Sequence, residues 1–139
     1  MTDSAEVRKQ LIDQACRTAK EFLDHYYVKV DSKRHAVAKT YLETATLSWN
    51  GNRVDGPEAI QKFFTDKVPS TSHQIYSYDA QPVLDEFVGG QKTVMVHVGG
   101  TVKFANDSRP RPFQQNFLLT AVGDYWKVAT DVFRYQDFK

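Results

Sequence analysis

The first thirty residues alternate between apolar and polar positions with the spacing of a helix. The apolar positions recur every three or four residues, at Val7, Leu11, Ala15, Ala19, Phe22, Tyr26 and Val30. This spacing places them along one side of a long amphipathic α-helix. The pattern ends at Asp31-Ser32, and serine is a residue type that caps helix starts. We therefore expect a second, shorter helix that begins after Ser32 and ends near Leu42.

A short hairpin and a third helix are predicted next. Residues 44–49 are typical of a strand, Asn50-Gly51 suits a type I′ turn, and residues 53–55 would form the returning strand. Gly56-Pro57 predicts the start of a third helix, because proline at the first helical position has no amide hydrogen to leave unpaired. The apolar side of that helix would consist of Ile60, Phe63 and Phe64.

The second half of the chain reads as β-structure. Strands are expected at residues 73–84, 92–104, 113–122 and 125–135. Glycine pairs or polar loops separate them, at Gly89-Gly90, residues 106–112 and Gly123-Asp124. Long strands joined by short turns form an antiparallel meander. Three helices followed by such a sheet predict one α+β domain with its helices on one face of the sheet.

Some of these strands are apolar on both faces. Residues 117–119 are consecutively apolar. Simple alternation places Trp126, Val128 and Val132 on one face of the last strand and Ala129, Phe133 and Tyr135 on the other. A sheet covered by helices on one side normally has a polar outer face. An apolar outer face predicts burial against another subunit. The alternative is that these strands are central and are covered by loops.

Composition and charge narrow the class of protein. The chain has 139 residues, a length typical of one domain, and nine Phe, seven Tyr and two Trp support a real hydrophobic core. The net charge of +1 provides no global field for binding nucleic acid directly. Cys16 is the only cysteine, which excludes an internal disulfide. With no apolar leader or membrane-spanning run in the sequence, we expect an intracellular protein without a membrane partner.

The amino-acid sequences of five segments resemble those of the nuclear transport factor 2 family. They are Phe22-Leu23-Asp24-His25-Tyr26-Tyr27, Ala45-Thr46-Leu47-Ser48-Trp49-Asn50-Gly51, Asp79-Ala80-Gln81-Pro82-Val83, Phe113-Gln114-Gln115-Asn116-Phe117 and residues 126–135. The resemblance extends from about residue 13 to residue 138, within a single domain of residues 1–139. It implies a cone of three helices packed on a curved, mainly antiparallel sheet. It also implies dimerisation through the open face of that sheet, which would account for the doubly apolar strands.

Two roles within the family compete for this chain. One is a homodimer that imports the GDP form of the small GTPase Ran. The other is an export-related subunit that pairs with the similarly folded domain of the large messenger-RNA export receptor. Acids of the importer correspond to Asn50 and Ala105 here, although Asp107 keeps a nearby charge, and its exposed nucleoporin-binding tryptophan corresponds to Ala15. Lost carboxylates weaken attraction to a basic partner, so these departures resemble the export subunit.

The resemblance to the export subunit implies partners and interface residues. The partner would be the large receptor, with nucleoporins bound through the complex and no direct nucleic acid, in a protein that shuttles between nucleus and cytoplasm at the nuclear pore. Arg134 would meet a carboxylate of the partner. Asp79 and Gln81 would make polar contacts, and Phe117 and Tyr135 would contribute apolar surface. We expect no catalytic residue, cofactor or metal.

An enzyme of the same fold, an isomerase or a dehydratase, is the remaining alternative. Such chemistry needs a carboxylate or histidine base facing tyrosine or acid donors inside the cone. The candidates are Tyr26, Tyr27, Asp85, His97 and Asp131. We expect instead that the aromatic residues fill the cone and that Asp131 satisfies a turn or interface hydrogen bond. His25, His35, His73 and His97 have no second ligand at zinc-site spacing, so we expect them to be solvated or in the core.

Overall fold

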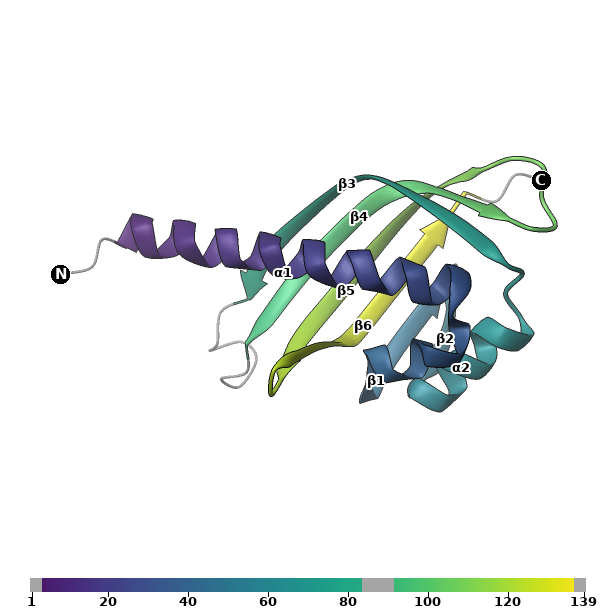
Figure 1. Cartoon of the computed structure of the whole chain (residues 1–139), viewed down its shortest axis with the longest axis horizontal. Coiled ribbons are helices and arrows are strands. Elements are labelled where there is room, and N and C mark those ends of the chain that lie inside the picture. Colours follow the sequence, from purple (N-terminus) through teal and green to yellow (C-terminus); the bar gives the residue numbers. More distant parts are fainter. Residues whose placement is uncertain (1–3, 84–91, 137–139) are drawn as a thin grey trace.

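The long N-terminal helix lies across one face of the sheet. The computed structural model describes residues 4–83 and 92–136. Helix α1 spans Ser4–Ser32 and packs mainly against β3, Thr71–Val83 (Figure 1). The predicted apolar side is buried from Ala15 onward, whereas Val7 and Leu11 remain 37% and 45% exposed. The helical prediction is therefore confirmed, but only its second half belongs to the core.

The segment after α1 differs from the prediction. Ser32 is the last residue of α1 and does not cap a second α-helix. The next element, η1, is a 3-10 helix of Arg34–Thr40, and Lys33 before it makes no side-chain cap. The polypeptide turns here with one short, tighter helix, whose buried residues are Val37 and Thr40.

The hairpin and the third predicted helix form as expected. Strands β1, Tyr41–Trp49, and β2, Asn52–Asp55, are joined by Asn50 and Gly51 with φ of 46° and 88°. Both values lie in the left-handed region that a type I′ turn requires. Helix α2 spans Pro57–Asp66 with Pro57 in its first turn, and it buries Ile60 and Phe64.

The remaining strands form the predicted meander within one six-stranded sheet. They are β3, β4 (Thr93–Phe104), β5 (Arg111–Val122) and β6 (Tyr125–Tyr135). The strand order is β2-β1-β6-β5-β4-β3. All neighbours are antiparallel except β1 and β6, which run parallel. The parallel pair was not predicted. Leu84 and Gly89-Gly90 lie outside the described residues.

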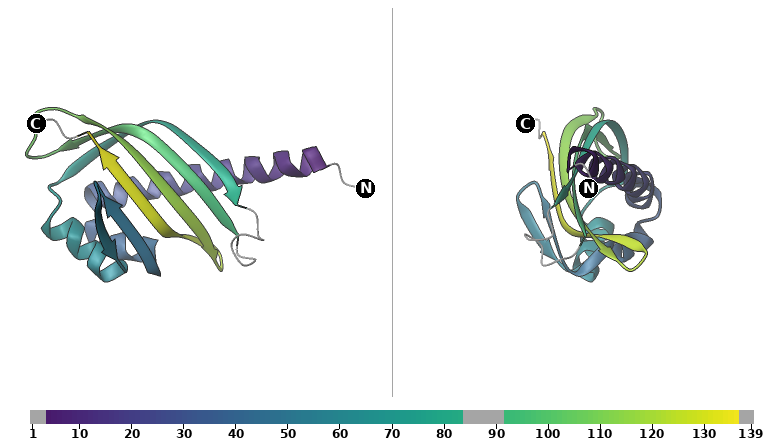
Figure 2. Two further views of the ribbon diagram at one scale, coloured as in Figure 1. Left: turned by 180° about the vertical axis from the view of Figure 1, so that it is seen from behind. Right: turned by 90° about the vertical axis from the view of Figure 1, so that its left-hand side faces the viewer.

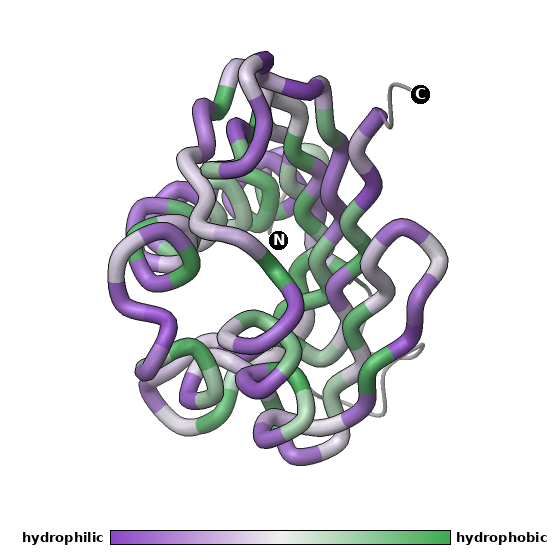
Figure 3. The backbone as a smooth tube through the Cα atoms, turned by 90° about the vertical axis from the view of Figure 1, so that its right-hand side faces the viewer, coloured by the Kyte–Doolittle hydropathy of each residue, from purple (hydrophilic) through white to green (hydrophobic). Residues whose placement is uncertain are grey.

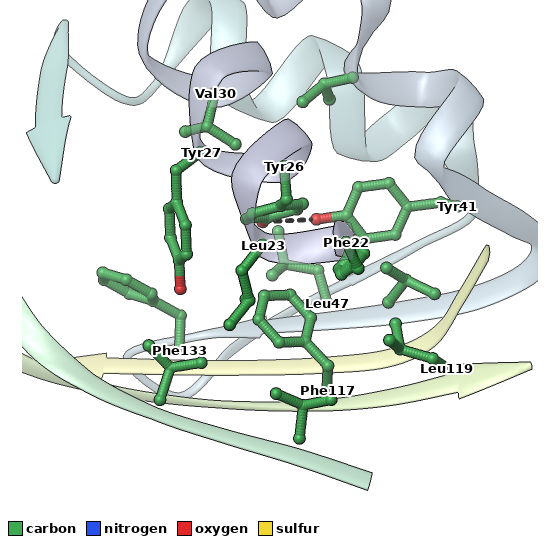
Figure 4. Close-up of a cluster of buried hydrophobic side chains, with 14 of the residues drawn as sticks. Phe22, Leu23, Tyr26, Tyr27, Val30, Tyr41, Leu47, Phe117, Leu119 and Phe133 are labelled. Atoms are coloured by element: carbon green, nitrogen blue, oxygen red, sulfur yellow. Dashed lines mark hydrogen bonds between the residues drawn. The ribbon is translucent and has the colours of Figure 1, made fainter. Parts of the chain in front are cut away.

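The helices cover one face of the sheet, and no described helix lies on the other. Seen from behind, α1 runs on the far side of the strands (Figure 2). Apolar side chains from α1 and from the strands meet between these layers, among them Phe22, Tyr26, Leu47, Phe117 and Phe133 (Figure 4). Among the described residues, no helix is both long enough and apolar enough to cross a membrane.

A bulge in β6 determines which of its residues face inward. The register shifts between Leu118 and Leu119, which pair with Thr130 and Val128, so that Ala129 is the extra residue. As a result Val128 and Phe133 are both buried on the helix side, with Asp131 between them. The prediction that Val128 and Phe133 lie on opposite faces was wrong, because alternation breaks at the bulge. Figure 3 shows hydrophobic and hydrophilic residues interspersed along the strands.

Candidate functional site

The face of the sheet opposite α1, here called the outer face, carries three neighbouring rows of side chains in its middle. Each row follows the pairing register across neighbouring strands. The Met95 row contains Gln81, Met95, Leu118, Thr130, Thr46 and Asp55. The His97 row contains Asp79, His97, Asn116, Val132, Ser48 and Arg53. The Gly99 row contains Ser77, Gly99, Gln114 and Arg134.

Apolar side chains are concentrated in the middle of the outer face. Met95 is 50% exposed. Leu118, beside it on β5, and Val132 on β6 are partly exposed. Met is flexible and polarisable, and it adapts to irregular apolar surfaces. The centre of the outer face is therefore moderately apolar with a polar surround, the composition of many protein interfaces.

The His97 row carries polar groups across the same centre. The Nδ1 atom of His97 lies 2.7 Å from Oδ1 of Asn116, its neighbour on β5. On its other side His97 faces Asp79 of β3. A partner that covers this row must satisfy these groups, because a buried polar group without a hydrogen bond is costly.

Arg134 is an exposed cation at the end of the Gly99 row. Among the described residues, no hydrogen bond or ion pair involves its guanidinium, whereas Arg34 binds backbone carbonyls and Arg53 and Arg111 pair with acids. The guanidinium is permanently charged and suits bidentate binding of a carboxylate. Arg134 is thus an exposed cation on the outer face with no partner among residues 4–83 and 92–136.

The structure places the five predicted interface residues in two groups. Arg134, Asp79 and Gln81 lie on the outer face. Phe117 is 1% exposed and packs edge-on against Phe22 at 5.1 Å between ring centroids, so it belongs to the core.

Tyr135 points to the inner side, where its ring lies 5.0 Å from that of Phe104. The expectation that Phe117 and Tyr135 supply apolar surface on the outer face was wrong, because both side chains point toward the face that the helices cover. Met95, Leu118 and Val132 occupy that surface instead. Sequence reasoning could have found Met95, since it alternates with the inward valines of β4.

A buried polar network lies within the cone. The Asp131 carboxylate accepts hydrogen bonds from the Tyr26 hydroxyl at 2.8 Å, the Tyr41 hydroxyl at 2.7 Å and Gln115 Nε2 at 2.7 Å. The Tyr27 hydroxyl donates to Gln115 Oε1 at 2.6 Å. Tyr26 and Tyr41 are also within hydrogen-bond distance of each other (Figure 4). Asp131 was expected at a turn or an interface, and this expectation was wrong.

Burial dominates the protonation of this network. It raises the pKa of Asp131 to about 6, although the hydrogen bonds from Gln115, Tyr41 and Tyr26 oppose the shift. Burial, and then the nearby Asp131 charge, raises the pKa of Tyr26 and of Tyr41 well above its usual range. Both hydroxyls therefore stay protonated and act as donors to the carboxylate.

The network does not assemble the acid–base set that an isomerase or dehydratase needs. Tyr26, Tyr27 and Asp131 come together, but His97 lies on the opposite face of the sheet and Asp85 is outside the described residues. Asp131 is 0% exposed and Gln115 is 1% exposed. The hydroxyl and amide donors therefore bond to these two buried side chains and are not directed at an open space. Tyr41 and Gln115 were not predicted. Gln115 could have been, because it is the polar residue between the inward Phe113 and Phe117.

The side chain of His73 is buried, which agrees with the expectation that the histidines are either solvated or in the core. Its Nδ1 lies 2.6 Å from Oδ1 of Asp31, and its amide donates to Oδ2 at 2.9 Å. Burial opposes ionisation of Asp31, but hydrogen bonds from His73 and Thr71 lower its pKa below the usual range. Among the described residues, no group of three or more His, Cys, Asp or Glu side chains could hold a metal ion.

The positions that correspond to importer acids lie at one end of the cone, near a cavity of about 390 Å³ lined in part by Trp49, Phe104 and Tyr135. Asn50 Nδ2 donates to the Tyr135 carbonyl at 3.3 Å, and its Oδ1 accepts from the Tyr135 amide at 2.8 Å. Asp107, the remaining nearby acid, forms an ion pair with Arg111. The local negative charge is thereby neutralised within the chain.

This fold and this uncovered sheet face define a nuclear transport factor 2-like domain. The sequence pattern of the Nuclear transport factor 2 (NTF2) domain matches residues 18–135, and the chain belongs to that family. It is 46% identical over 134 residues to NTF2-related export protein 1 of Bos taurus, covering 94% of each chain. It is 34% identical over 138 residues to the NTF2-related export protein of Caenorhabditis elegans, covering 99% of this chain and 98% of the relative.

A solved structure agrees with the fold. Nuclear transport factor 2 from Cryptosporidium parvum superposes with a TM-score of 0.78 at 26% identity, covering 91% of this chain and 98% of the other. The resemblance to NTF2-related export proteins seen in the sequence is confirmed by these relatives. The two named relatives that match nearly the whole chain are described as export proteins and not as enzymes.

Proposed function

We propose that the chain is a non-catalytic subunit that forms a heterodimer with the similarly folded domain of the large messenger-RNA export receptor. In this role it supports nucleoporin binding by the complex and the nuclear export of messenger RNA. It moves between nucleus and cytoplasm and works at the nuclear pore. The names of its relatives, which are export proteins, support the transport role.

The observation that carries the proposal is the unpartnered Arg134 on the outer face. Arg134 is exposed, lies next to the partly exposed Val132 along β6, and makes no hydrogen bond or ion pair within the described part of the chain. A partner carboxylate would give it one, and the apolar centre would be buried at the same time. The polar groups of the His97 row favour a partner with matched polar groups over an indiscriminate apolar contact.

Co-expression with the receptor domain tests the proposal. The expected result is a one-to-one complex in native mass spectrometry that survives gel filtration, and a chain that melts at a higher temperature with the domain than without it. Binding that occurs only in the native state produces such a shift by mass action. A monodisperse monomer whose melting temperature does not change with the receptor domain would exclude the proposed pairing.

Import of Ran-GDP by a homodimer is the second candidate. It is favoured by 32% identity over 117 residues to Nuclear transport factor 2 of Oryza sativa subsp. japonica, covering 84% of this chain and 92% of the relative. The absence of acids at Asn50 and Ala105 and the pairing of Asp107 with Arg111 argue against it. Titration calorimetry with Ran-GDP separates the two, since micromolar binding at physiological salt would favour the importer.

A further inference from the structure

Two adjacent glycines, Gly99 and Gly100, interrupt the valine-rich strand β4. A glycine inside a strand lowers stability relative to a residue with a side chain, so each needs a reason. The reason for Gly100 lies within the chain. A Cβ at Gly100 would lie 2.1 Å from the carbonyl oxygen of Gln74, because β3 bulges between Ile75 and Ser77 and brings its backbone close.

Gly99 has no such reason within the chain. Its φ is outside the left-handed region, so any L-amino acid could adopt this backbone conformation. A Cβ at Gly99 would meet Oγ of Ser77 at 3.3 Å, and that atom is the rotatable end of a short side chain. Valine or threonine would be favoured in a strand at this position.

Gly99 lies on the outer face, where its missing side chain leaves an open position. Along β4 its neighbours on that face are His97 and Thr101, and across the sheet they are Ser77 and Gln114. Arg134 lies two strands away in the same row. At a strand spacing of about 4.8 Å, that separation is roughly 10 Å.

We infer that Gly99 determines the choice of partner, by leaving room for a bulky apolar side chain of the receptor domain in the same row as Arg134, about 10 Å from it across the sheet. This inference rests on the proposed function. Gly99 is partly exposed, and its strand backbone is already paired with the neighbouring strands, so it offers close packing and no further hydrogen bond, which suits an aliphatic or aromatic group. A side chain at Gly99 would hold the partner away from both Arg134 and the apolar centre.

The test compares four variants of the full chain, each measured alone by thermal melting and with the receptor domain by titration calorimetry. Gly99→Val should melt at the same or a higher temperature than the wild type and bind about tenfold more weakly or worse. Gly99→Ala should show a smaller loss in the same direction. Ser77→Ala, the matched control, removes the neighbouring hydroxyl and should leave both measurements unchanged. Gly100→Ala should lower the melting temperature.

The outcomes separate the inference from the function on which it rests. If the wild-type chain does not bind the receptor domain, the proposed function fails before any variant is made. If the wild type binds and both Gly99 variants bind equally well, the function stands and the inference is overturned. If Gly99→Ala melts as low as Gly100→Ala, the glycine serves the strand itself, which also overturns the inference.

Discussion

Tyr26 of α1 donates a hydrogen bond of 2.8 Å to Asp131 of β6, although 105 positions separate the two residues in the sequence. This contact joins the N-terminal helix to the last strand across the interior of the cone. Because the carboxylate is cut off from water, its charge depends on the donors of Tyr26, Tyr41 and Gln115. The stability of the chain should therefore respond to pH and to the loss of single hydroxyl groups.

Replacement of Asp131 by Asn should remove a pH dependence of stability. The pKa of Asp131 is raised from 3.8 in the unfolded chain to about 6 in the folded one. The folded state thus binds the proton more tightly, so its stability is greatest at low pH and falls as pH rises from about 4 to about 6. The change amounts to about 3 kcal/mol.

Urea unfolding at a series of pH values measures this effect. The free energy of unfolding of Asp131→Asn should not change between pH 4 and 6, where that of the wild type falls. Asp79→Asn, on the outer face, is the surface control and should show the same fall as the wild type. Asp31 does not obscure the result, because its pKa is lowered and its contribution is lost only below its unfolded pKa. A wild-type chain with no decline between pH 4 and 6 would contradict the assignment.

Loss of the Tyr41 hydroxyl should cost more at neutral pH than at low pH. At pH 7 Tyr41→Phe removes a hydrogen bond to a charged carboxylate, worth about 1.5–3 kcal/mol, whereas near pH 4 the same group is neutral. Tyr27→Phe is the matched control, since the Tyr27 hydroxyl donates to the uncharged Gln115 at 2.6 Å. Denaturation at both pH values should show a pH-dependent loss for Tyr41→Phe and a nearly constant one for Tyr27→Phe. Equal pH profiles would contradict the ionised state of Asp131 at pH 7.

Arg134→Ala should abolish capture of the receptor domain without unfolding the chain. If Arg134 pairs with a partner carboxylate in the complex, its removal leaves that acid buried and unpaired, at a cost of about 3–5 kcal/mol. Binding should then weaken by about two to three and a half orders of magnitude. Arg134→Lys should restore part of the affinity, because lysine lacks the planar fork.

A charge exchange supplies the decisive control for this pair. Arg134→Asp should be rescued by arginine or lysine at the partner carboxylate, and Arg53→Ala on the same face should have little effect because Arg53 already pairs with Asp55 at 2.9 Å. Unchanged affinity for Arg134→Ala would leave the interface to apolar contacts alone.

Asn50→Asp should destabilise the turn and should not create binding of Ran-GDP. Aspartate also tolerates the φ of 46° found here, but it has no donor for the Tyr135 carbonyl and would place a negative charge against it. We expect a loss of about 1 kcal/mol. Thermal melting and calorimetry with Ran-GDP measure the two effects, with Asn106→Asp as the exposed control. Strong Ran-GDP binding by Asn50→Asp would mean that this one position separates exporter from importer.

Much of the fold was predictable because it depends on local chemistry. The helical spacing up to Val30, the Asn50-Gly51 turn and Pro57 each specify a conformation within a few residues. The bulge at Ala129 and the parallel pairing of β1 with β6 were not predictable, because they depend on contacts between distant segments. The bulge explains why Val128 and Phe133 share a face, because one extra residue in a strand reverses inward and outward for every position on one side of it. Phe117 and Tyr135 were misplaced for another reason, since alternation within a strand does not say which of its two faces the helices cover.

The position of β6 constrains how the chain is made in the cell. Of the six described strands it comes last in the sequence, yet it lies between β1 and β5 in the middle of the sheet. Until it leaves the ribosome, the first hairpin has no strand to join and Tyr26 has no acid to bind. Until β6 has been synthesised, no described strand joins the β1–β2 pair to the β5–β4–β3 part of the sheet, so the sheet cannot close. Any truncation before β6 removes a central strand that joins two parts of the sheet, and not merely an edge strand.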